Sequence, residues 1–299
     1  MMRQAFLFLS QQKGMRKWME TSPVAAKLTS RFIAGLTLED ELAVCARLAE
    51  RRIFATLDHL GENVTSLAEA EACRNDYLTA LDEIGKRGLP ATVSIKLTQF
   101  GLDLSTEACL ENAMALGARA AERGTRIEID MESSDYTDRT LDIVEKVGTA
   151  RAVIQAYLYR SQADIERLNA RNIPVRLCKG AYKEPVSLAY PKKIDVDRNF
   201  LALMKLLLDK GTYPAIASHD ETIIGEALRY ARERKIPAEK FEFQMLYGIR
   251  SDLQRRIVDM GYRMRVYVPY GTAWYPYFMR RLAERPANAL FLARNFLKR

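Results

Sequence analysis

The segment Arg263-Met-Arg-Val-Tyr-Val268, followed by Gly271 and then by Trp274-Tyr-Pro-Tyr-Phe-Met-Arg-Arg281, contains the pattern that decides the fold of this chain. Its first six residues alternate and include β-branched and aromatic side chains, which predicts a strand. Gly271 ends that strand, and a helical pattern with Pro276 in its first turns follows. The segment therefore predicts one strand followed by one helix.

The same unit recurs along the chain. The predicted strands are Ile53–Asp58, Ala91–Leu97, Arg126–Asp130, Ala152–Tyr157, Pro174–Lys179, Tyr213–Ser218, Phe241–Met245 and Arg263–Val268. The helices predicted after the first seven are Ser66–Arg87, Ser105–Arg123, Tyr136–Lys146, Gln162–Arg171, Asp197–Asp209, Ile223–Arg234 and Ser251–Met260. Strict alternation implies a parallel sheet, and eight such units predict an α/β fold of the closed (βα)₈ TIM-barrel type. No Gly-x-Gly-x-x-Gly follows the first strand, which argues against a classical dinucleotide-binding fold.

The first 52 residues show helical patterns only. Thr37 and Asp40 predict a capping pair for a helix over Leu38–Arg51. We therefore expect residues 1–52 to form a helical segment packed on the barrel, and residues 53–299 to form the barrel with its last helix over the mouth. The apolar run Ala5–Leu9 is too short for a signal-peptide core or a membrane span, and predicts either a docked helix or an interfacial amphipathic helix.

Composition limits the classes of partner. The 299 residues are 48% hydrophobic, which is enough for a large core, and the net charge is +8. Such a charge attracts nucleic acid, an anionic membrane surface or an acidic small molecule, but the basic residues are spread along the chain and form no nucleic-acid arm. The four cysteines are far apart and there are two histidines, so we expect no metal site and reduced cysteines in a cytoplasmic protein.

Polar side chains lie at the predicted C-terminal ends of the strands, where barrels carry their chemistry. They are Asp58, Lys96, Asp130, Gln155, Arg176, Lys179, Ser218, His219, Gln244 and Tyr267. A buried cation needs an acidic partner or an anionic ligand, and we expect the partners to be Asp130, Glu62 and Glu284. The mouth is therefore predicted to hold several cations and few acids, which suits phosphate and carboxylate groups.

The last predicted helix places Tyr277, Arg280, Arg281 and Glu284 on one face. Such a pair of arginines is either a solvated basic helix end or a bidentate grip for a carboxylate. A lysine at a strand end also allows Schiff-base chemistry, with Lys96 and Lys179 as candidates. A non-catalytic ligand-binding or membrane-associated barrel is the third possibility.

Four ordered motifs decide between these alternatives. Arg176-Leu-Cys-Lys-Gly-Ala-Tyr182, Ala217-Ser-His-Asp220, Phe243-Gln-Met-Leu-Tyr-Gly248 and the segment Tyr267–Arg285 together resemble the proline dehydrogenase family, over about Phe54 to Lys298. The resemblance implies the small monofunctional bacterial form, with FAD held non-covalently. It also implies oxidation of L-proline to Δ1-pyrroline-5-carboxylate, transfer of the electrons to a membrane quinone, and peripheral contact with the inner face of the plasma membrane. Whether the chain forms an oligomer stays open.

The resemblance also assigns roles to residues. Lys96, Arg280 and Arg281 would hold the substrate carboxylate, Glu284 would pair with Lys96, and the ring of the substrate would lie against Tyr267, Tyr182 and Leu246. Arg176 would hydrogen bond to the flavin, and Asp130 would belong to the same polar network. The residues expected to bind FAD are Met131, Gln155, Lys179, Gly180, Ala181, Ser218, His219 and Gln244. We further expect Glu62 to pair with Arg280 and close the site over bound substrate.

Overall fold

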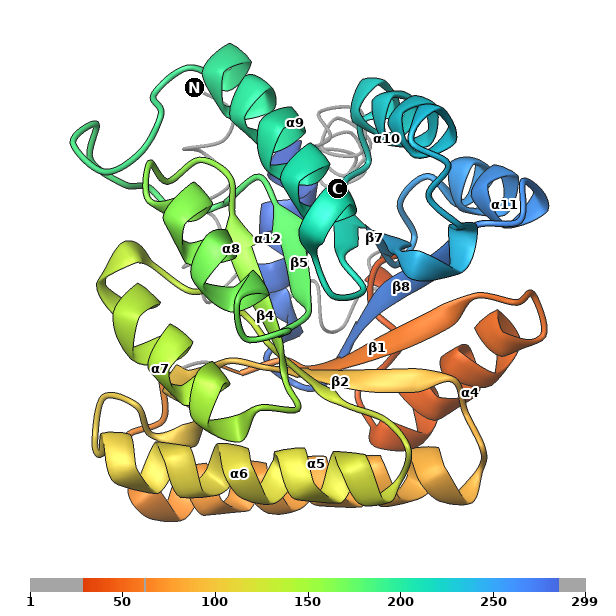
Figure 1. Ribbon diagram of the computed structural model, residues 1–299. Coiled ribbons are helices and arrows are strands. Elements are labelled where there is room, and N and C mark those ends of the chain that lie inside the picture. Colours follow the sequence, from red (N-terminus) through yellow and green to blue (C-terminus); the bar gives the residue numbers. More distant parts are fainter. Residues whose placement is uncertain (1–28, 62, 285–299) are drawn as a thin grey trace, which may run out of the picture.

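The computed structural model of the protein describes residues 29–61 and 63–284, with side chains as far as Met279. Within these residues, eight strands form one closed barrel in chain order (Figure 1). The strands are β1 (Phe54–His59), β2 (Ala91–Ile95), β3 (Ile127–Ile129), β4 (Arg151–Gln155), β5 (Val175–Cys178), β6 (Ala215–Ala217), β7 (Glu242–Leu246) and β8 (Arg263–Tyr270). Every pair of neighbours is parallel, and the barrel closes where β1 pairs with β8, with Thr56 opposite Tyr267. The predicted (βα)₈ barrel is confirmed.

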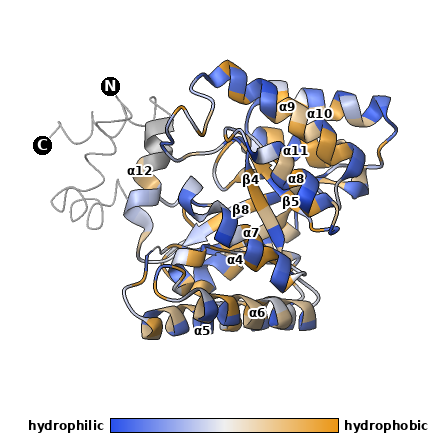
Figure 2. Cartoon of the chain, turned by 60° about the vertical axis from the view of Figure 1, so that its left-hand side comes forward, coloured by the Kyte–Doolittle hydropathy of each residue, from blue (hydrophilic) through white to orange (hydrophobic). Residues whose placement is uncertain are grey.

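A helix follows each strand and packs around the barrel or covers its end. The helices are α5 (Leu67–Lys86), α6 (Thr106–Glu122), α7 (Thr137–Val147), α8 (Ser161–Asn169), α9 (Lys193–Lys210), α10 (Glu221–Glu233), α11 (Ser251–Asp259) and α12 (Trp274–Glu284). Short 3₁₀ turns lie at Leu97–Phe100, Ser134–Tyr136 and Ala238–Lys240. Apolar residues are concentrated in the strands and on the inner faces of the helices (Figure 2), which places the main core between the two layers.

One helix precedes the barrel strands in the described part of the predicted N-terminal segment. Helix α4 (Leu38–Ala49) begins with the predicted capping pair: the Asp40 N–H donates to the Thr37 hydroxyl over 3.2 Å, and the Thr37 N–H donates to the Asp40 carboxylate over 3.0 Å. It packs outside the barrel against β1 and β8, the position that a helix after β8 would otherwise occupy. Helix α12 is therefore free to lie at the barrel mouth, where its Tyr277 lines a cavity.

The strand boundaries differ from the predicted ones at two positions that matter for the site. β2 ends at Ile95, so Lys96 lies just beyond it, because the chain turns at once into a 3₁₀ helix that ends at Gly101 with φ +88°. β8 continues past Val268 to Tyr270 and stops at Gly271, whose φ of +111° disfavours any residue with a side chain. Lys96 thus lies on a loop at the rim, whereas Tyr267 lies within β8.

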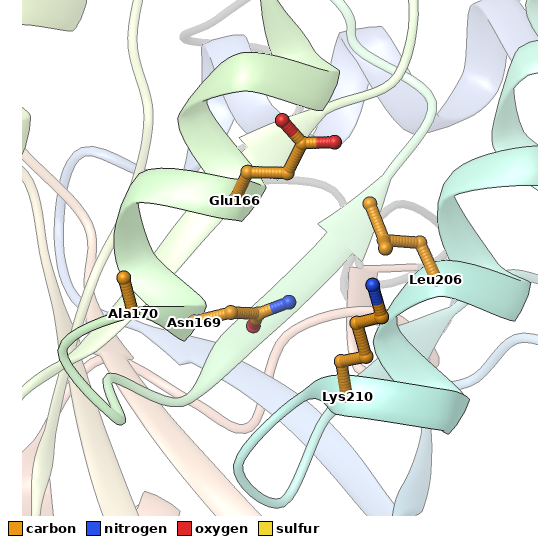
Figure 3. A pocket seen from close by; sticks show the side chains of 5 residues that line it. All are labelled: Glu166, Asn169, Ala170, Leu206 and Lys210. Atoms are coloured by element: carbon orange, nitrogen blue, oxygen red, sulfur yellow. The ribbon is translucent and has the colours of Figure 1, made fainter.

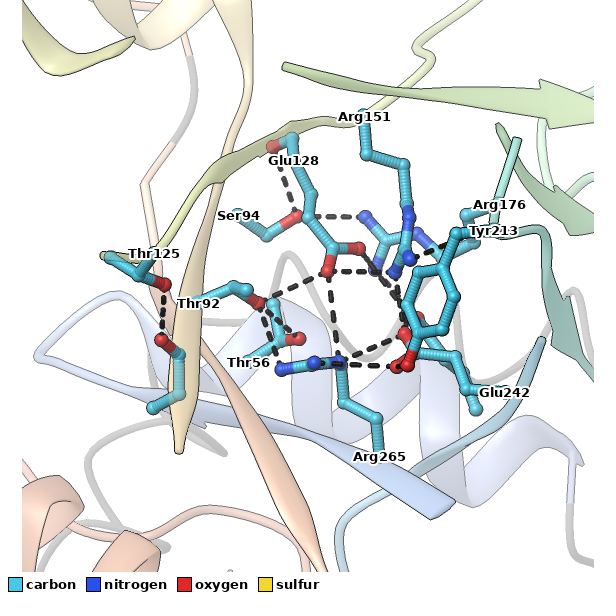
Figure 4. A network of polar contacts seen from close by, with 12 residues as sticks. Thr56, Thr92, Ser94, Thr125, Glu128, Arg151, Arg176, Tyr213, Glu242 and Arg265 are labelled. Carbon is cyan, nitrogen blue, oxygen red and sulfur yellow. Dashed lines mark hydrogen bonds and ion pairs between the residues drawn. The ribbon is translucent and has the colours of Figure 1, made fainter. Parts of the chain in front are cut away.

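Charged side chains form a buried network inside the barrel (Figure 4). Arg151 pairs with Glu128 over 3.2 Å and also with Glu242, and the Arg265 Nε donates to Glu242 over 2.9 Å. The side chains of Glu128, Arg151 and Glu242 are fully buried. None of these ion pairs was predicted, because a strand such as Ile127-Glu128-Ile129 shows only that Glu128 and its two neighbours face opposite sides of the sheet.

Hydroxyl groups complete this buried network. The Thr92 hydroxyl donates to Glu128 over 3.0 Å and lies 2.8 Å from the Thr56 hydroxyl. The aromatic ring of Tyr213 also contacts the network, with 5.3 Å between its centroid and the Arg151 guanidinium carbon. Burial by itself would raise the pKa of Glu128, but the positive charges of Arg151, Arg176 and Arg265 outweigh it and hold that pKa below its usual value. The carboxylates therefore stay ionised as the counter-charges that the buried arginines require.

Candidate active site

A cavity of about 640 Å³ opens at the C-terminal ends of the barrel strands. Every predicted site residue whose side chain the structure describes lines it: Lys96, Asp130, Met131, Gln155, Arg176, Lys179, Gly180, Ala181, Tyr182, Ser218, His219, Gln244, Leu246 and Tyr267. This volume falls in the range of small-molecule and cofactor sites. The parallel strands bring together side chains that are more than 150 residues apart in sequence. This agrees with the barrel fold, in which one site is built from the C-terminal ends of several strands.

Arg176, on β5, lines the cavity and keeps only 5% of its side chain exposed. Its guanidinium forms an ion pair with Asp130, donates to the Ser94 hydroxyl over 2.8 Å and donates to the Gln244 amide oxygen over 3.3 Å. The buried Nε has no hydrogen-bond partner among the described residues. The group is thus fixed by neighbours from three other strands or strand ends, with one donor left over.

The Asp130 carboxylate accepts hydrogen bonds from three side chains. Besides Arg176, the Ser94 hydroxyl donates to it over 2.9 Å and the Tyr267 hydroxyl over 2.8 Å. Burial, with the nearby Asp130 charge, raises the pKa of Tyr267 well above its ordinary value. Tyr267 therefore stays protonated and serves as a donor, and its ring lies 5.4 Å from the Arg176 guanidinium carbon.

Lys96 has an acidic partner that the sequence did not identify as one. Its Nζ lies 3.6 Å from Asp58 at the end of β1, with side-chain exposures of 12% and 2%. Burial raises the pKa of Asp58 although the Lys96 charge opposes this, and the Asp130 charge raises it further. Asp58 was recognised as a polar strand end but was not assigned to the site.

Lys179 also lies between carboxylates. It pairs with Asp197 from α9 and, over 3.0 Å, with Asp220 from the start of α10. The prediction that the mouth holds few acids is therefore wrong for the described residues: Lys96, Arg176 and Lys179 each face a carboxylate. The physical reason is that a partly buried cation without a counter-charge is costly. Asp58 and Asp130 come from the ends of β1 and β3, and the helices α9 and α10 supply Asp197 and Asp220.

The Ser218-His219-Asp220 turn joins β6 to α10 and closes one side of the cavity. The His219 Nε2 accepts the Leu246 N–H over 2.9 Å, so this nitrogen carries no proton. The Ser218 hydroxyl accepts the Asp220 N–H over 3.1 Å, and Asp220 caps α10 by accepting the Thr222 N–H. In the described part of the chain, no cluster of His, Cys, Asp and Glu side chains is arranged to hold a metal ion.

At Gly180 only a residue without a side chain can fit. Its φ is +107°, and a Cβ there would lie 2.2 Å from a ring carbon of Tyr157. Both the conformation and the space exclude a side chain. The part of the cavity wall formed by Gly180 is therefore main chain without a side chain.

The side chains of four predicted residues lie outside the part of the chain that the structure describes. Glu62 lies outside the described residues, as do the side chains of Arg280, Arg281 and Glu284 on α12. The helix itself reaches the mouth, since Tyr277, one turn earlier, lines the cavity. Tyr277 was not predicted as a cavity residue, although it shares the helix face on which the two arginines were expected.

A second cavity of about 350 Å³ lies between α8 and α9 (Figure 3). Its lining comes from the last turns of these helices, with Glu166, Asn169 and Lys210 as the polar groups. Helix C-termini lead into strand N-termini, so this cavity is at the opposite end of the barrel from the mouth. Barrel enzymes place their chemistry at the other end.

The fold and the cavity define a (βα)₈ barrel whose polar site is formed at the C-terminal ends of its strands. Residues 42–294 match the family described as Proline dehydrogenase. The chain is 43% identical over 307 residues to "Proline dehydrogenase 1" of Bacillus subtilis (strain 168), covering 100% of both sequences. It is 40% identical over 283 residues to "Proline dehydrogenase" of Deinococcus radiodurans, covering 91% of this chain and 90% of the other. The chain belongs to the proline dehydrogenase family, whose reaction is the first step of proline catabolism.

The structural comparison agrees with the sequence comparison. The proline utilization A (PutA) structure from Bdellovibrio bacteriovorus, inactivated by N-propargylglycine, superimposes with a TM-score of 0.82 at 27% identity. The match covers 94% of this chain and 36% of that chain. PutA of Bradyrhizobium japonicum, at 24% identity and a TM-score of 0.76, shares the same fold.

Proposed function

We propose that this proline dehydrogenase binds FAD in the cavity, oxidises L-proline to Δ1-pyrroline-5-carboxylate and passes the electrons to a quinone. One observation carries the proposal: every described residue to which the family resemblance gives a role lines a single cavity. The family membership and the relatives named above support the same reaction.

The cavity lining fits a flavin on its own chemistry. Val153, Met131 and Met245 offer an apolar surface for a ring system, and the side-chain amides of Gln155 and Gln244 offer hydrogen bonds to a polar ring edge. The unpartnered Nε of Arg176 is one donor that the protein leaves unused. Lys179, the bare backbone at Gly180 and the N-terminus of α10 suit an anionic tail. Met131, Gln155, Lys179, Gly180, Ala181, Ser218, His219 and Gln244 are thus the proposed FAD-binding residues.

The substrate half of the cavity combines a cation with an apolar wall. We expect Lys96, with Arg280 and Arg281 from α12, to bind the carboxylate of L-proline, and Glu284 to pair with Lys96. Tyr267, Tyr182 and Leu246 would bury the pyrrolidine ring. A charged clamp at one end and an apolar wall at the other leave the ring only one orientation.

When bound, the flavin supplies the redox chemistry by accepting hydride from the substrate. Arg176 is held in place by Asp130 and Ser94, and its charge is positioned to stabilise negative charge that develops on the cofactor. Asp130 already accepts hydrogen bonds from Arg176, Ser94 and Tyr267. These bonds use most of the acceptor capacity of the carboxylate, and we infer that the proton of the substrate amine leaves to solvent.

The predicted gate stays a proposal. We propose that Glu62, in the loop after β1, pairs with Arg280 when substrate is bound and closes the mouth. Glu62→Ala should then weaken proline binding and slow turnover. Unchanged values of both kcat and KM in that variant would remove the gate.

The Schiff-base alternative requires a lysine that loses its proton readily. Lys96 faces Asp58 and Lys179 faces Asp197 and Asp220, so both amines are engaged in ion pairs with carboxylates and lie in no apolar pocket. Neither lysine therefore has the surroundings that activate an amine for attack on a carbonyl group.

The visible spectrum of the purified chain tests the proposal directly. We expect flavin absorption bands that L-proline bleaches without oxygen and that a quinone analogue then restores. A flavin spectrum unaffected by L-proline would overturn the substrate. Protein that stays colourless after incubation with FAD would overturn the cofactor.

A further inference from the structure

A group of two arginines and one tyrosine lies at the base of the barrel, the end at which the strands begin. Arg126 directly precedes β3, Arg263 is the first residue of β8, and Tyr213 lies in the turn between α9 and β6. We call these three residues the basal triad. Because the mouth is formed by the C-terminal ends of the strands, the basal triad lies at the opposite end of the barrel from the site described above.

The aromatic ring of Tyr213 is the centre of the basal triad. The Tyr213 hydroxyl donates to the Glu242 carboxylate over 2.9 Å, and its carbonyl accepts from Arg151 over 3.2 Å, which joins the triad to the buried network (Figure 4). The guanidinium carbons of Arg126 and Arg263 each lie 5.4 Å from the centroid of the ring. Tyr213 has a φ of +47°, which is uncommon for an aromatic residue, so these contacts hold the ring in a backbone conformation that is otherwise rarely adopted.

The two arginines of the triad have no carboxylate partner. The two glutamates of the buried network already face Arg151 and Arg265. Among the described residues, no acid forms an ion pair with Arg126 or Arg263, whose side chains are half-buried and keep part of their surface open to solvent. Burial and the positive charge of Arg151 lower the pKa of Arg126 below its ordinary value. The base of the barrel therefore carries two cations in excess.

The loops around the basal triad add to this positive charge. The described segments that lead from helices α4 to α11 into the next strands contain nine arginines and lysines and two acids, Glu50 and Glu239. The helix dipole favours cations at helix C-termini, which explains exposed ones such as Lys235. It does not explain Arg126, because a half-buried guanidinium beside other arginines is costly unless an anion accompanies it.

We propose that the basal triad is a binding site for a phosphate-bearing anion, with the guanidinium groups of Arg126 and Arg263 as its partners. A guanidinium group presents a fork of N–H donors that matches the oxygens of a phosphate group. The two excess positive charges equal the charge of a phosphate dianion, and the basic loops raise the local concentration of such an anion. The bound anion supplies the counter-charge that the half-buried arginines lack. This site is separate from the cavity and does not rest on the proposed function.

Isothermal titration calorimetry with the full-length, FAD-loaded protein tests the proposal, with inorganic phosphate and pyrophosphate as probes at constant ionic strength. We expect saturable binding that Arg126→Gln and Arg263→Gln each weaken at least about tenfold, because each removes a charge-assisted hydrogen-bond partner. Binding of both probes supports a site for a free or terminal phosphate group, and binding of pyrophosphate alone supports a ligand that spans both arginines. Wild-type protein that binds neither probe would overturn the proposal, and equal binding of the dicarboxylate succinate would overturn the assignment to phosphate.

Thermal unfolding separates anion binding from a purely structural role of the arginines. Phosphate at about ten times its Kd should raise the melting temperature of the wild type by roughly 2–4 °C, and this shift should be lost in Arg126→Gln whatever the stability of that variant without phosphate. The matched control is Arg255→Gln, since Arg255 is exposed on α11 and forms no ion pair with any described residue. Equal loss of binding in the control would show that only the general positive charge acts, and would overturn the proposal. Bleaching of the flavin by L-proline tests the proposed function separately, so either idea can fail without the other.

Discussion

Lys96 and Asp58 face each other from the ends of the adjacent strands β1 and β2, with 3.6 Å between the ammonium nitrogen and the nearer carboxylate oxygen. Asp58 is almost fully buried, and Lys96 keeps only a small exposed surface at the cavity. The acid therefore helps to hold the ammonium group in place, and the small exposed part of Lys96 lies at the cavity. A substrate carboxylate would meet a lysine that is already oriented.

Replacing Lys96 by Met should raise the KM for L-proline strongly and lower kcat/KM by an amount equivalent to on the order of 2–5 kcal/mol. The substrate carboxylate would lose a cation, and Asp58 would lose its ion-pair partner. Steady-state kinetics with a soluble acceptor measure the change. Lys86→Met is the control, because Lys86 is exposed on α5 and pairs only with Glu83, over 3.2 Å, within the described residues. Near-normal proline kinetics in Lys96→Met would remove this lysine from the substrate site.

Tyr267→Phe tests the hydrogen bond to Asp130. The variant keeps the aromatic ring beside Arg176 and loses only the hydroxyl that lies 2.8 Å from the carboxylate. A hydrogen bond to a charged group contributes about 1.5–3 kcal/mol, so we expect kcat/KM to fall about tenfold or more. Since its raised pKa keeps Tyr267 protonated, the ratio of variant to wild type should not change between pH 6 and about 9.

Tyr230→Phe provides the matched control for that experiment. Its hydroxyl also donates to an aspartate, Asp209, over 2.7 Å, but on the outer surface of the barrel. Kinetics as strongly impaired in Tyr230→Phe as in Tyr267→Phe would mean that loss of any such bond acts through general stability.

The barrel and the location of its site could be predicted from sequence because both depend on local patterns. The alternation at Arg263–Val268 and the break at Gly271 identify a strand and its end, and the polar residue at such an end must face the mouth. These patterns predict that Arg176, Lys179 and Tyr267 lie near strand ends at the mouth, and the structure brings all three to one cavity.

The partners of these residues could not be predicted in the same way. Asp197 reaches Lys179 because α9 begins at Lys193, four residues before the predicted start, and this start depends on how the preceding loop packs. Arg151 and Glu242 meet across the barrel interior although they are 91 residues apart. Pairings of this kind depend on strand register, which a single sequence does not contain.

Gly180→Ala should disturb the proposed cofactor site. The added Cβ would lie 2.2 Å from the Tyr157 ring, so either the ring or the backbone at the cavity wall must move. We expect a clear fall in bound flavin per protein, measured from the ratio of visible to ultraviolet absorbance. Gly124→Ala separates this steric effect from backbone strain, because Gly124 also has a positive φ, +66°, with nothing within 4 Å of the added atom. Equal flavin content in the two variants would show that close approach at Gly180 is not needed.

The buried network makes a pH-dependent contribution to stability whose sign follows from Glu242. Burial alone would raise the pKa of this carboxyl group, but Arg265 and Arg151 lower it far below the ordinary value of 4.5. A carboxyl group with a depressed pKa contributes stability that is fully present above its unfolded pKa and is lost as the pH falls toward the folded value. We therefore expect the contribution of Glu242 to be constant from pH 7 to about 5.5 and to decline below about pH 4.5.

Glu242→Gln should destabilise the protein at pH 7 by about 3–5 kcal/mol, because Arg151 and Arg265 would lose a buried counter-charge. The loss should shrink as the pH falls below about 4.5, where the wild type itself begins to lose the contribution. Urea unfolding at pH 7, 5.5 and 4 measures both effects. Glu226→Gln is the control: interactions with Arg229 and Lys205 lower its pKa to about 2, but at the protein surface, where an ion pair contributes at most about 1 kcal/mol. A Glu242 variant no less stable than the Glu226 variant would show that the interior ion pairs do not stabilise the barrel, since burial is the main physical difference between the two sites.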